Sequence, residues 1–521
     1  MSVYFVDSME DSDDSSNSPL VISTDNYEGG ISKSRTCCLC SKKSCVIINV
    51  VLVILCICLI SATTYLGIQS TKTSSRKSRT TLEAGLKFYQ VSDTHLDIYY
   101  NEKVNGLNWQ MCRAIKRKNG YKVNYTEGAA PYGRIKCDSP YKLLQSSADF
   151  IGNLNRDTKA EFVILSGDQS AHAYSSFEVD AYKSIVWSIV NSTRIFYEAT
   201  GLPIIFSIGN NDLPVHYNPP TENPDLFYGD LVNELRKYIF PKATVMSELN
   251  SPKDFNETFL QGGYYVAHVS ELVQIITLNT NYWNTKCFKN NPNITYIGDM
   301  QIKWLENSLN NASKSNKRVI VTGHIPPGVS TYGNEGSYWL KNYTTKYIQL
   351  VSNYSDIIIG QLYGHAHKDK IKIQNVHDSF YPNTQLSIPK AFLLMSPSIT
   401  PIEENNAAFR MFTLSKDLEL SDYTQYYMDF TLANAHGEAL WEKEYTFSEC
   451  YGARISMKAI QGIVQNLVTF KNSTWVRYMT HMKSNYGGIL TENIFKEYCS
   501  AQHVTLDAYL DCVKYYENQG L

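Results

Sequence analysis

The chain has 521 residues, and its 48 basic and 50 acidic side chains leave a formal net charge of -2. This length exceeds that of a usual single domain and suffices for a large hydrophobic core with a smaller unit beside it. A charge so close to zero gives no general attraction to a polyanion, so we expect no nucleic-acid-specific binding.

Three segments precede the predicted folded body. Residues 1–45 open with acidic and serine residues and show no helical or strand period, which predicts a disordered cytosolic tail. Residues 46–68 are mostly apolar and reach the ~20 residues that span a bilayer. Because they lie far from Met1, they favour an uncleaved transmembrane signal-anchor over a cleaved signal peptide. Residues 69–85 are polar and predict a stalk.

Glycosylation sequons indicate the orientation of the chain across the membrane. Asn-x-Ser/Thr occurs only after the predicted span, at Asn124, Asn191, Asn256, Asn293, Asn311, Asn342, Asn353 and Asn472. Since N-glycans are carried by surfaces of secretory-pathway proteins, we expect N-glycans on the C-terminal body. The chain is therefore predicted to be a single-pass type II membrane protein with a catalytic domain that is lumenal, in a lysosome or vacuole, or extracellular.

The body also contains an even number of cysteines. They are Cys112, Cys137, Cys287, Cys450, Cys499 and Cys512. An oxidising compartment favours disulfides, although six cysteines allow 15 pairings. Proximity in the sequence suggests two of the bonds, Cys112 with Cys137 and Cys499 with Cys512.

Two regions of different character make up the body. Over residues 86–415, strand-like runs alternate with amphipathic helical stretches at 141–153, 179–190 and 300–309, as in an α/β catalytic domain. Over residues 416–521 the pattern changes: 423–445 predicts mixed strand and helix, and 455–478 and 491–516 predict helices. We expect a smaller, mainly helical C-terminal domain there.

Polar residues follow five β-branched or apolar runs of the first region. The runs are residues 88–91, 162–165, 204–206, 319–321 and 357–359, and the residues that follow them are Asp93 and His95, Asp168, Asn210, His324, and His365 with His367. Open α/β sheets place their chemistry at the carboxyl ends of strands. Any one of these residues alone would be an ordinary turn aspartate or core histidine, but five similar events favour a shared site.

Such a set suits two divalent cations ~3.5–4 Å apart, which together clamp a phosphoryl oxygen and activate a water. One carboxylate must bridge the ions, and imidazoles with a neutral oxygen complete the mixed N/O shells. Asp168 is the candidate bridge. Asp93, His95 and His367 would complete one metal site, and Asn210, His324 and His365 the other.

The motifs Asp93-Thr-His95, Gly167-Asp168, Gly209-Asn210, Gly323-His324 and Gly364-His-Ala-His367 resemble the calcineurin-like metallophosphoesterases. Cys137-Asp-Ser-Pro140 and the block from Asn434 to Tyr445 are similar to the acid sphingomyelinase-like phosphodiesterases and the related vacuolar endopolyphosphatases. The resemblance implies an α/β fold, a β-sandwich flanked by helices, with a dimetal site at one edge. It also implies that the two divalent ions are zinc.

One position departs from the usual family motif. Most members carry Gly-Asn-His followed by an acid, and that histidine protonates the leaving oxygen, whereas this chain has Asn211, whose amide does not titrate near neutrality. Two histidines are candidates to donate the proton instead. His172 follows Asp168 by four residues and His216 follows Asn211 by five. Endopolyphosphatases share the Gly-Asn-Asn-Asp form, followed shortly by proline and histidine.

These features predict a hydrolase of P–O bonds in phosphodiesters or phosphoanhydrides. The expected substrates are phosphorylated small molecules or polyphosphate: nucleotides, polyphosphate or phospholipid head groups. A vacuolar-type endopolyphosphatase is the alternative, and a catalytically weak binding ectodomain is a further one. Two basic clusters would either track a polyanion or form solvated faces, and we favour solvated faces. They are Arg113, Lys116, Arg117, Lys118 and Lys122, and Lys368, Lys370 and Lys372.

Overall fold

A computed structural model describes residues 85–519 apart from 107–110, 121, 223–224, 288–290, 332–335, 381–388, 470–471 and 488–493. The predicted tail, membrane span and most of the stalk lie outside this part of the chain. Within it, no helix combines the length and the apolar character that crossing a membrane requires.

The first sheet has six strands in the order β14-β13-β12-β1-β2-β3. Their bounds are β1 Lys87–Val91, β2 Val163–Leu165, β3 Ile204–Phe206, β12 Ala407–Leu414, β13 Leu420–Met428 and β14 Trp441–Thr446. β1, β2 and β3 run parallel, whereas β12 pairs antiparallel with β1. Two strands beyond residue 415 thus extend the sheet that begins with β1, so the predicted C-terminal domain shares this sheet with the catalytic domain.

The second sheet also has six strands, in the order β10-β11-β9-β6-β5-β4. Their bounds are β4 Tyr265–His268, β5 Val273–Thr277, β6 Arg318–Thr322, β9 Ile358–Tyr363, β10 Lys370–Gln374 and β11 Ala391–Met395. Its middle strands β5, β6, β9 and β11 are parallel. A short hairpin of β7 (Val329–Ser330) and β8 (Gly336–Ser337) lies outside both sheets.

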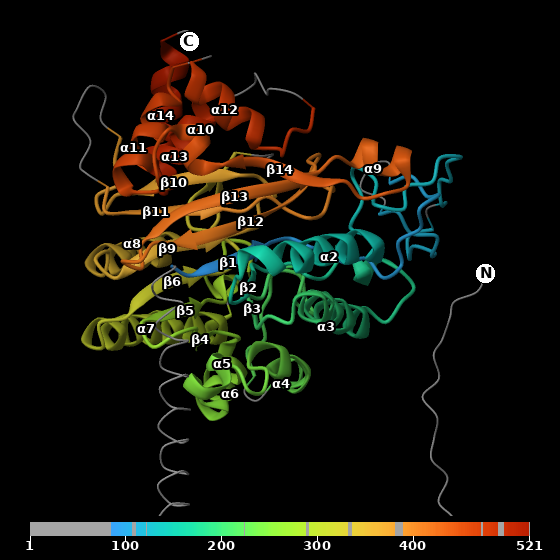
Figure 1. The fold of residues 1–521 in the computed structure, drawn as a ribbon, viewed down its shortest axis with the longest axis horizontal. Helices are drawn as coiled ribbons and strands as arrows, with labels where there is room; N and C mark the ends of the chain where they lie inside the picture. Colours follow the sequence, from blue (N-terminus) through green and yellow to red (C-terminus); the bar gives the residue numbers. More distant parts are fainter. Residues whose placement is uncertain are drawn as a thin grey trace, which may run out of the picture. The chain divides into compact units, whose positions relative to one another are not determined.

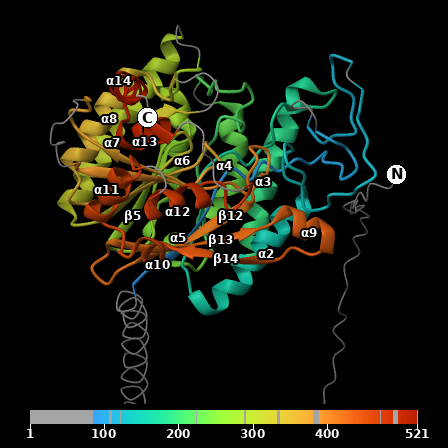
Figure 2. The ribbon, with the colours of Figure 1, turned by 90° about the horizontal axis from the view of Figure 1, so that it is seen from above.

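Helices cover the outer faces of the two sheets (Figures 1 and 2). α2 (Tyr141–Thr158) and α3 (Ala181–Thr200) pack on the first sheet, and α7 (Pro292–Lys314) and α8 (Lys341–Asn353) on the second. The others are α4 Leu226–Ile239, α5 Val245–Leu249, α6 Pro252–Gly262, α9 Phe430–His436, α10 Phe447–Tyr451, α11 Met457–Asn466, α12 Ser473–His481, α13 Ile494–Gln502 and α14 Leu506–Asn518, with 3-10 turns at Tyr174–Ser176 and Thr280–Trp283.

The helices α2, α3 and α7 extend well beyond the amphipathic stretches that predicted them. α3 begins where the Asp180 side chain accepts a hydrogen bond from the backbone N–H of Lys183, and it ends at Gly201 in the left-handed conformation. Asp180 is a typical N-cap and Gly201 a typical C-cap. These caps define the ends of the helix, which the apolar periodicity did not indicate.

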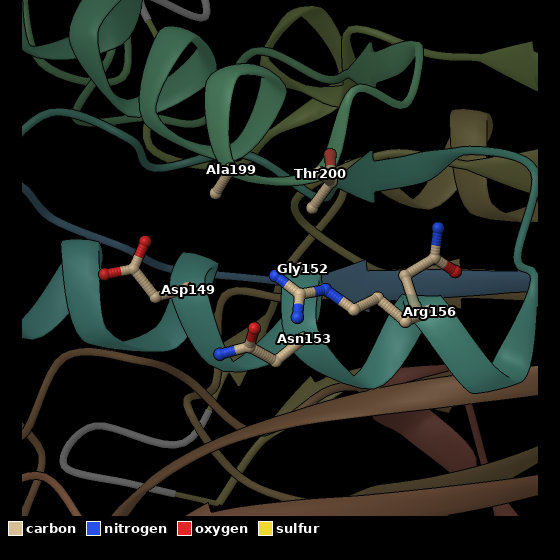
Figure 3. Close-up of a pocket in the computed structure, with 7 residues that line it drawn as sticks. Asp149, Gly152, Asn153, Arg156, Ala199 and Thr200 are labelled. Atoms are coloured by element: carbon tan, nitrogen blue, oxygen red, sulfur yellow. The ribbon is translucent and has the colours of Figure 1, made fainter.

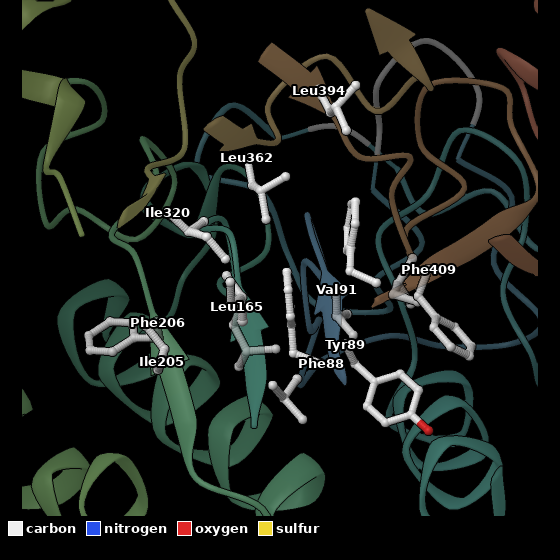
Figure 4. Close-up of a cluster of buried hydrophobic side chains, with 14 of the residues drawn as sticks. Phe88, Tyr89, Val91, Leu165, Ile205, Phe206, Ile320, Leu362, Leu394 and Phe409 are labelled. Carbon is white, nitrogen blue, oxygen red and sulfur yellow. The ribbon is translucent and has the colours of Figure 1, made fainter. Parts of the chain in front are cut away.

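The main core lies between the two sheets. Phe88, Val91 and Leu165 from the first sheet meet Ile320 and Leu362 from the second in one buried cluster (Figure 4). Val319 and Val321, the neighbours of Ile320 on β6, instead face α7 and α8 in another cluster. Because successive side chains of a strand point to opposite faces, this alternation buries the second sheet on both sides.

Both predicted disulfides are confirmed. Cys112–Cys137 and Cys499–Cys512 have Cα–Cα distances of 5.5 and 5.8 Å. The second bond joins α13 to α14 in the helical C-terminal region.

The sequons differ in their accessibility. Asn191 lies on α3, is only 6% exposed, and its amide donates to the carbonyl of Trp187. Five sequons are exposed: Asn124, Asn293, Asn311, Asn342 and Asn353. The folded chain therefore offers several sequons to a glycan but not the one at Asn191.

Candidate metal centre

The five predicted motifs lie on loops at the carboxyl ends of β1, β2 and β3 in the first sheet and of β6 and β9 in the second. Backbone hydrogen bonds tie the loops together. His95 N–H donates to the Asp168 carbonyl at 2.9 Å, and Gly364 N–H to the His324 carbonyl at 3.1 Å. Between the sheets, the His365 N–H donates to the Asp93 carboxylate at 3.0 Å. Residues from positions 93 to 367 thereby meet at one end of the two sheets.

We call the seven predicted ligands the strand-end cluster: Asp93, His95, Asp168, Asn210, His324, His365 and His367. Six of them form two groups able to hold a metal ion, Asp93 with His95 and His367, and Asp168 with His324 and His365. The His367 Nε2 lies 3.2 Å from Asp93 Oδ1, and His324 Nε2 lies 3.2 Å from Asp168 Oδ2.

Asp168 lies between the two groups. Its Oδ2 is 3.2 Å from His324 Nε2 in one group and 3.5 Å from His95 Nε2 in the other. A single carboxylate shared in this way is the arrangement expected of a bridging ligand.

Unpaired buried atoms test whether this set fits a pair of metal ions. His95 Nε2 and Asn210 Oδ1 are buried and have no hydrogen-bond partner. Buried polar atoms nearly always have a bonding partner, so each of these two atoms needs a partner that accepts a lone pair, such as a cation. The Asn210 Nδ2 lies 3.1 Å from His216 Nε2, an arrangement that turns Oδ1 toward the cluster. Carboxylates, imidazoles and one amide oxygen form a mixed N/O set that suits zinc, manganese or iron.

The backbone orients the imidazoles of the cluster. His95 Nδ1 lies 3.0 Å from the Ser170 carbonyl and His324 Nδ1 lies 2.8 Å from the Ser166 carbonyl. Since a carbonyl can only accept, each Nδ1 carries a proton, and Nε2 is the nitrogen of each ring that can bind a cation once it has lost its own proton.

The ligand backbone is unusual. Five of the seven cluster residues have positive φ, namely Asp93, His95, Asp168, His365 and His367, with values from 42° to 74°. Non-glycine residues rarely adopt this region, and such outliers concentrate at functional sites. Close approach also explains two motif glycines: a Cβ on Gly209 would lie 2.0 Å from Asp168 Oδ1, and one on Gly364 would lie 1.9 Å from Ser92 Oγ.

The electrostatics of the cluster are strongly coupled. Burial favours neutral carboxyls, but the nearby His367 and His324 hold the pKa of Asp93 well below its usual range. In the same way, His324 lowers the pKa of Asp168. Burial opposes the charge on His324, and Asp168 and Asp93 nevertheless raise its pKa to about 9. Two carboxylates kept ionised in a buried site attract cations.

A cavity of about 550 Å³ lies between α2 and α3, and no residue of the strand-end cluster lines it (Figure 3). Its described lining is polar, from Asp149, Asn153, Asn155, Arg156 and Thr200, and includes no histidine or cysteine. Four cluster residues instead face a second cavity of about 540 Å³, which we call the active cavity: Asp168, Asn210, His365 and His367.

The three residues predicted for catalysis also line the active cavity. His172 stacks on the ring of His95 at 4.2 Å, and its Nδ1 lies 2.9 Å from Asp138 Oδ1. Although burial opposes its charge, the Asp138 carboxylate raises the pKa of His172 above its usual value. Burial lowers the pKa of His216 to about 4. Asn211 donates to Asp168 from both its backbone N–H, at 2.8 Å, and its Nδ2, at 2.7 Å.

Several residues of the site were not predicted as site residues. Asp138 belongs to the Cys137-Asp-Ser-Pro140 motif, which was a usable signal. Tyr217, Lys286, Tyr338 and Glu403 line the active cavity and carry no motif.

The two basic clusters differ: Lys116 and Lys118 of the first are exposed, as we expected, whereas Arg113 and the three lysines of the second are buried. Arg113 is buried and pairs with Asp97 at 2.7 Å. Lys368, Lys370 and Lys372 are all buried as well, and Lys370 pairs with Glu497 at 2.9 Å. The helices α11 and α13 cover β10 and account for the burial of its lysines.

A family model, the calcineurin-like phosphoesterases, matches residues 86–369, more than half of the chain. The chain belongs to this family. The model of the acid sphingomyelin phosphodiesterase C-terminal region matches residues 386–519. Both matches confirm the predicted family, and the phosphoesterase is a hydrolase of phosphoric esters.

Relatives support the same assignment. The chain is 28% identical to the cyclic GMP-AMP phosphodiesterase SMPDL3A of Rattus norvegicus, over 82% of this chain and 92% of the relative. It is 30% identical to the sphingomyelinase phosphodiesterase C of Dictyostelium discoideum, over 76% and 86%. Among solved structures, a dimetal phosphatase from Danio rerio matches with 10% identity and a TM-score of 0.36, covering 69% of this chain and 98% of that one. We draw no argument from a score this low.

Proposed function

We propose that this phosphoesterase uses two divalent cations, zinc by its resemblance to the acid sphingomyelinase-like branch, to hydrolyse P–O bonds of phosphodiesters or phosphoanhydrides. The observation that carries the proposal is the strand-end cluster, in which His95 Nε2 and Asn210 Oδ1 are buried without partners and Asp168 lines the active cavity. The two relatives described above, SMPDL3A and sphingomyelinase phosphodiesterase C, are both phosphodiesterases by name, which is consistent with it.

In this proposal Asp168 bridges the ions. Asp93, His95 and His367 hold one, and Asn210, His324 and His365 hold the other. Bound there, the ions would polarise the scissile P–O bond and supply an activated water.

His172 is the residue that we propose as proton donor to the leaving oxygen. Its Nδ1 and its backbone N–H both face Asp138, at 2.9 and 2.7 Å, which fixes the ring and leaves Nε2 as the nitrogen able to serve the substrate. Orientation of an imidazole by a buried carboxylate is the usual way to prepare a general acid.

Asn211 and His216 have positioning roles in the proposal. Asn211 holds the bridging carboxylate through two hydrogen bonds and has no proton to give. His216 stays neutral over the physiological range because burial lowers its pKa to about 4. A neutral His216 can accept the amide hydrogen of Asn210 and so direct the amide oxygen toward a cation.

The location of the domain remains the predicted one, lumenal or extracellular. Two disulfides and five exposed sequons support it. Glycosidase treatment of protein from native membranes should remove several glycans, and mass spectrometry should find Asn191 unmodified. A band that does not shift would contradict this location.

The test of the enzyme proposal is a substrate panel assayed with the purified domain, residues 86–521. His172→Ala should slow substrates with basic leaving groups by about 100-fold, the usual range for a general acid, and change activated aryl phosphodiesters little. Its metal content should stay that of the wild type. Bound metal without hydrolysis of any phosphodiester or phosphoanhydride would instead favour the binding ectodomain.

A further inference from the structure

Lys286 is a cation at the edge of the active cavity. Among the described residues that line this cavity it is the single lysine or arginine. Its loop follows the 3-10 turn Thr280–Trp283 and precedes α7, far in sequence from the metal motifs.

Hydrogen bonds hold this lysine in place. Its backbone N–H donates to Asn284 Oδ1 at 2.6 Å, and the neighbouring Thr285 N–H donates to the Tyr338 carbonyl at 3.0 Å. Its Nζ donates to Tyr217 Oη at 3.0 Å and lies 4.5 Å from the centre of the Tyr217 ring. The ammonium is therefore presented by an ordered loop.

Tyr217 connects Lys286 to the metal centre. The Tyr217 N–H donates to the carbonyl of Asn210 at 3.4 Å. Its ring stands edge-on to that of His365, with centroids 6.3 Å apart. Lys286 is thus one aromatic ring away from two candidate metal ligands.

The charge of Lys286 lacks an acidic partner. In the described part of the chain the contacts of its Nζ are to Tyr217 and none is to a carboxylate, although Glu403 lines the same cavity. The Oη of Tyr217 accepts from Lys286, so the phenol hydrogen is left for another acceptor. An ammonium and a phenol hydrogen directed at one cavity form a site for an anion.

We propose that Lys286 and Tyr217 bind a second phosphoryl group, adjacent to the one that is cleaved. The site would then prefer oligophosphates, such as nucleoside triphosphates and inorganic polyphosphates, to phosphodiesters with uncharged substituents. This inference rests on the proposed function, because the first phosphoryl group is the one at the strand-end cluster.

Such substrates can be hydrolysed without a general acid from the protein. The oxygen of water forms a bond to the scissile phosphorus, and the bridging P–O bond breaks with its electron pair on the departing phosphate. The proton lost by water passes to solvent. A departing phosphate is stable as an anion, so it needs no proton from position 211, where this chain has asparagine.

Lys286→Gln tests the subsite with two substrates, inorganic tripolyphosphate and bis(p-nitrophenyl) phosphate, at saturating divalent cation. Loss of one charge-assisted contact should raise KM for tripolyphosphate about tenfold. KM for the diester should change less than twofold. Lys286→Arg should retain the tripolyphosphate preference, and Lys253→Gln, an exposed lysine on α6, is the matched control.

Equal changes with both substrates would show that Lys286 only supports its loop through Tyr217, and unchanged kinetics would also overturn the subsite. Binding separates this failure from failure of the enzyme proposal. Calorimetry should show that wild type binds adenosine 5′-(β,γ-imido)triphosphate about tenfold more tightly than AMP, and that Lys286→Gln loses the difference. This holds even if wild type hydrolyses neither substrate. Absence of the preference in wild type overturns the proposal.

Discussion

Two buried clusters of charge differ in how their members are paired. The first is the strand-end cluster. The second, which we call the β14 cluster, joins the first sheet to the C-terminal helices and consists of Asp369, Arg410, Glu444, Tyr445 and His481. In the β14 cluster each charge faces its opposite: Arg410 contacts Asp369, and His481 Nδ1 lies 2.8 Å from Glu444 Oε1.

The strand-end cluster shows the contrary pattern. Its ligand atoms crowd around one point, its backbone is strained at five residues, and it retains buried atoms without partners. A buried charge that is already paired contributes to structure, whereas ligand atoms that converge on one point and include unpaired lone pairs indicate a binding site. Burial and charge alone do not distinguish a site from a structural cluster, but the state of pairing does.

The largest effect is expected from Asp168→Asn. The change removes the proposed bridging charge, so activity should fall by about 1,000-fold or more. Elemental analysis should show less bound metal, while the melting temperature of the metal-free protein should stay close to that of the wild type. A variant that keeps full activity would exclude Asp168 as the bridge.

Arg410→Met should affect stability instead. Removing one partner leaves the Asp369 carboxylate buried and uncompensated, which should lower the free energy of unfolding by about 3 to 5 kcal/mol. Urea unfolding followed by tryptophan fluorescence measures it. The double variant Arg410→Met/Asp369→Leu should recover most of the loss, and a double variant as unstable as the single one would contradict the role of the pair.

A smaller, pH-dependent effect is expected at His481. Burial favours its neutral form, but hydrogen bonds to Cys450 and Glu444 raise its pKa from 6.5 to about 9. Since the folded pKa is above the unfolded one, the stabilisation is complete below pH 6.5 and is lost as the pH rises through 9. The full shift would correspond to roughly 3 kcal/mol, and because the ring is partly exposed to solvent we expect about 2 kcal/mol.

The measurement is urea unfolding of wild type and His481→Gln across this pH range. The two proteins should differ most at pH 6.5 and converge above pH 9. His436→Gln, an exposed histidine on α9, serves as the control. Parallel curves at all pH values would show that His481 does not change its protonation on unfolding.

The strands and their polar ends could be predicted because each signal is local. A run such as residues 163–165 is buried on every residue, and the glycine and aspartate after it end the strand. The five strand ends lie together because parallel strands direct their carboxyl ends to one edge. The two disulfides could be predicted because the cysteines of each pair are close in the sequence.

Other features depend on contacts between distant segments and leave no local signal. Lys286 faces the active cavity because its loop bonds to Tyr338, some fifty residues later. Lys372 is buried against α13, so a lysine-rich stretch that predicted a solvated face lies in the interior of the molecule. The positive φ values at Asp93 and His365 occur where loops from the two sheets meet, at the hydrogen bond from the His365 N–H to the Asp93 carboxylate, and composition does not reveal this meeting.

The position of β1 has a consequence for the synthesis of the chain. Among the described residues β1 is the first strand to be synthesised, yet its antiparallel partner β12 pairs Lys87 with Thr413, more than three hundred residues later. The ribosome therefore releases Asp93 and His95 long before their strand can acquire both neighbours. Pairing over such a separation is slow, and β1 presents an open edge until it is complete. The native sheet thus forms only after most of the chain has been translated, and premature termination before β12 leaves the first metal motif on an unsealed strand.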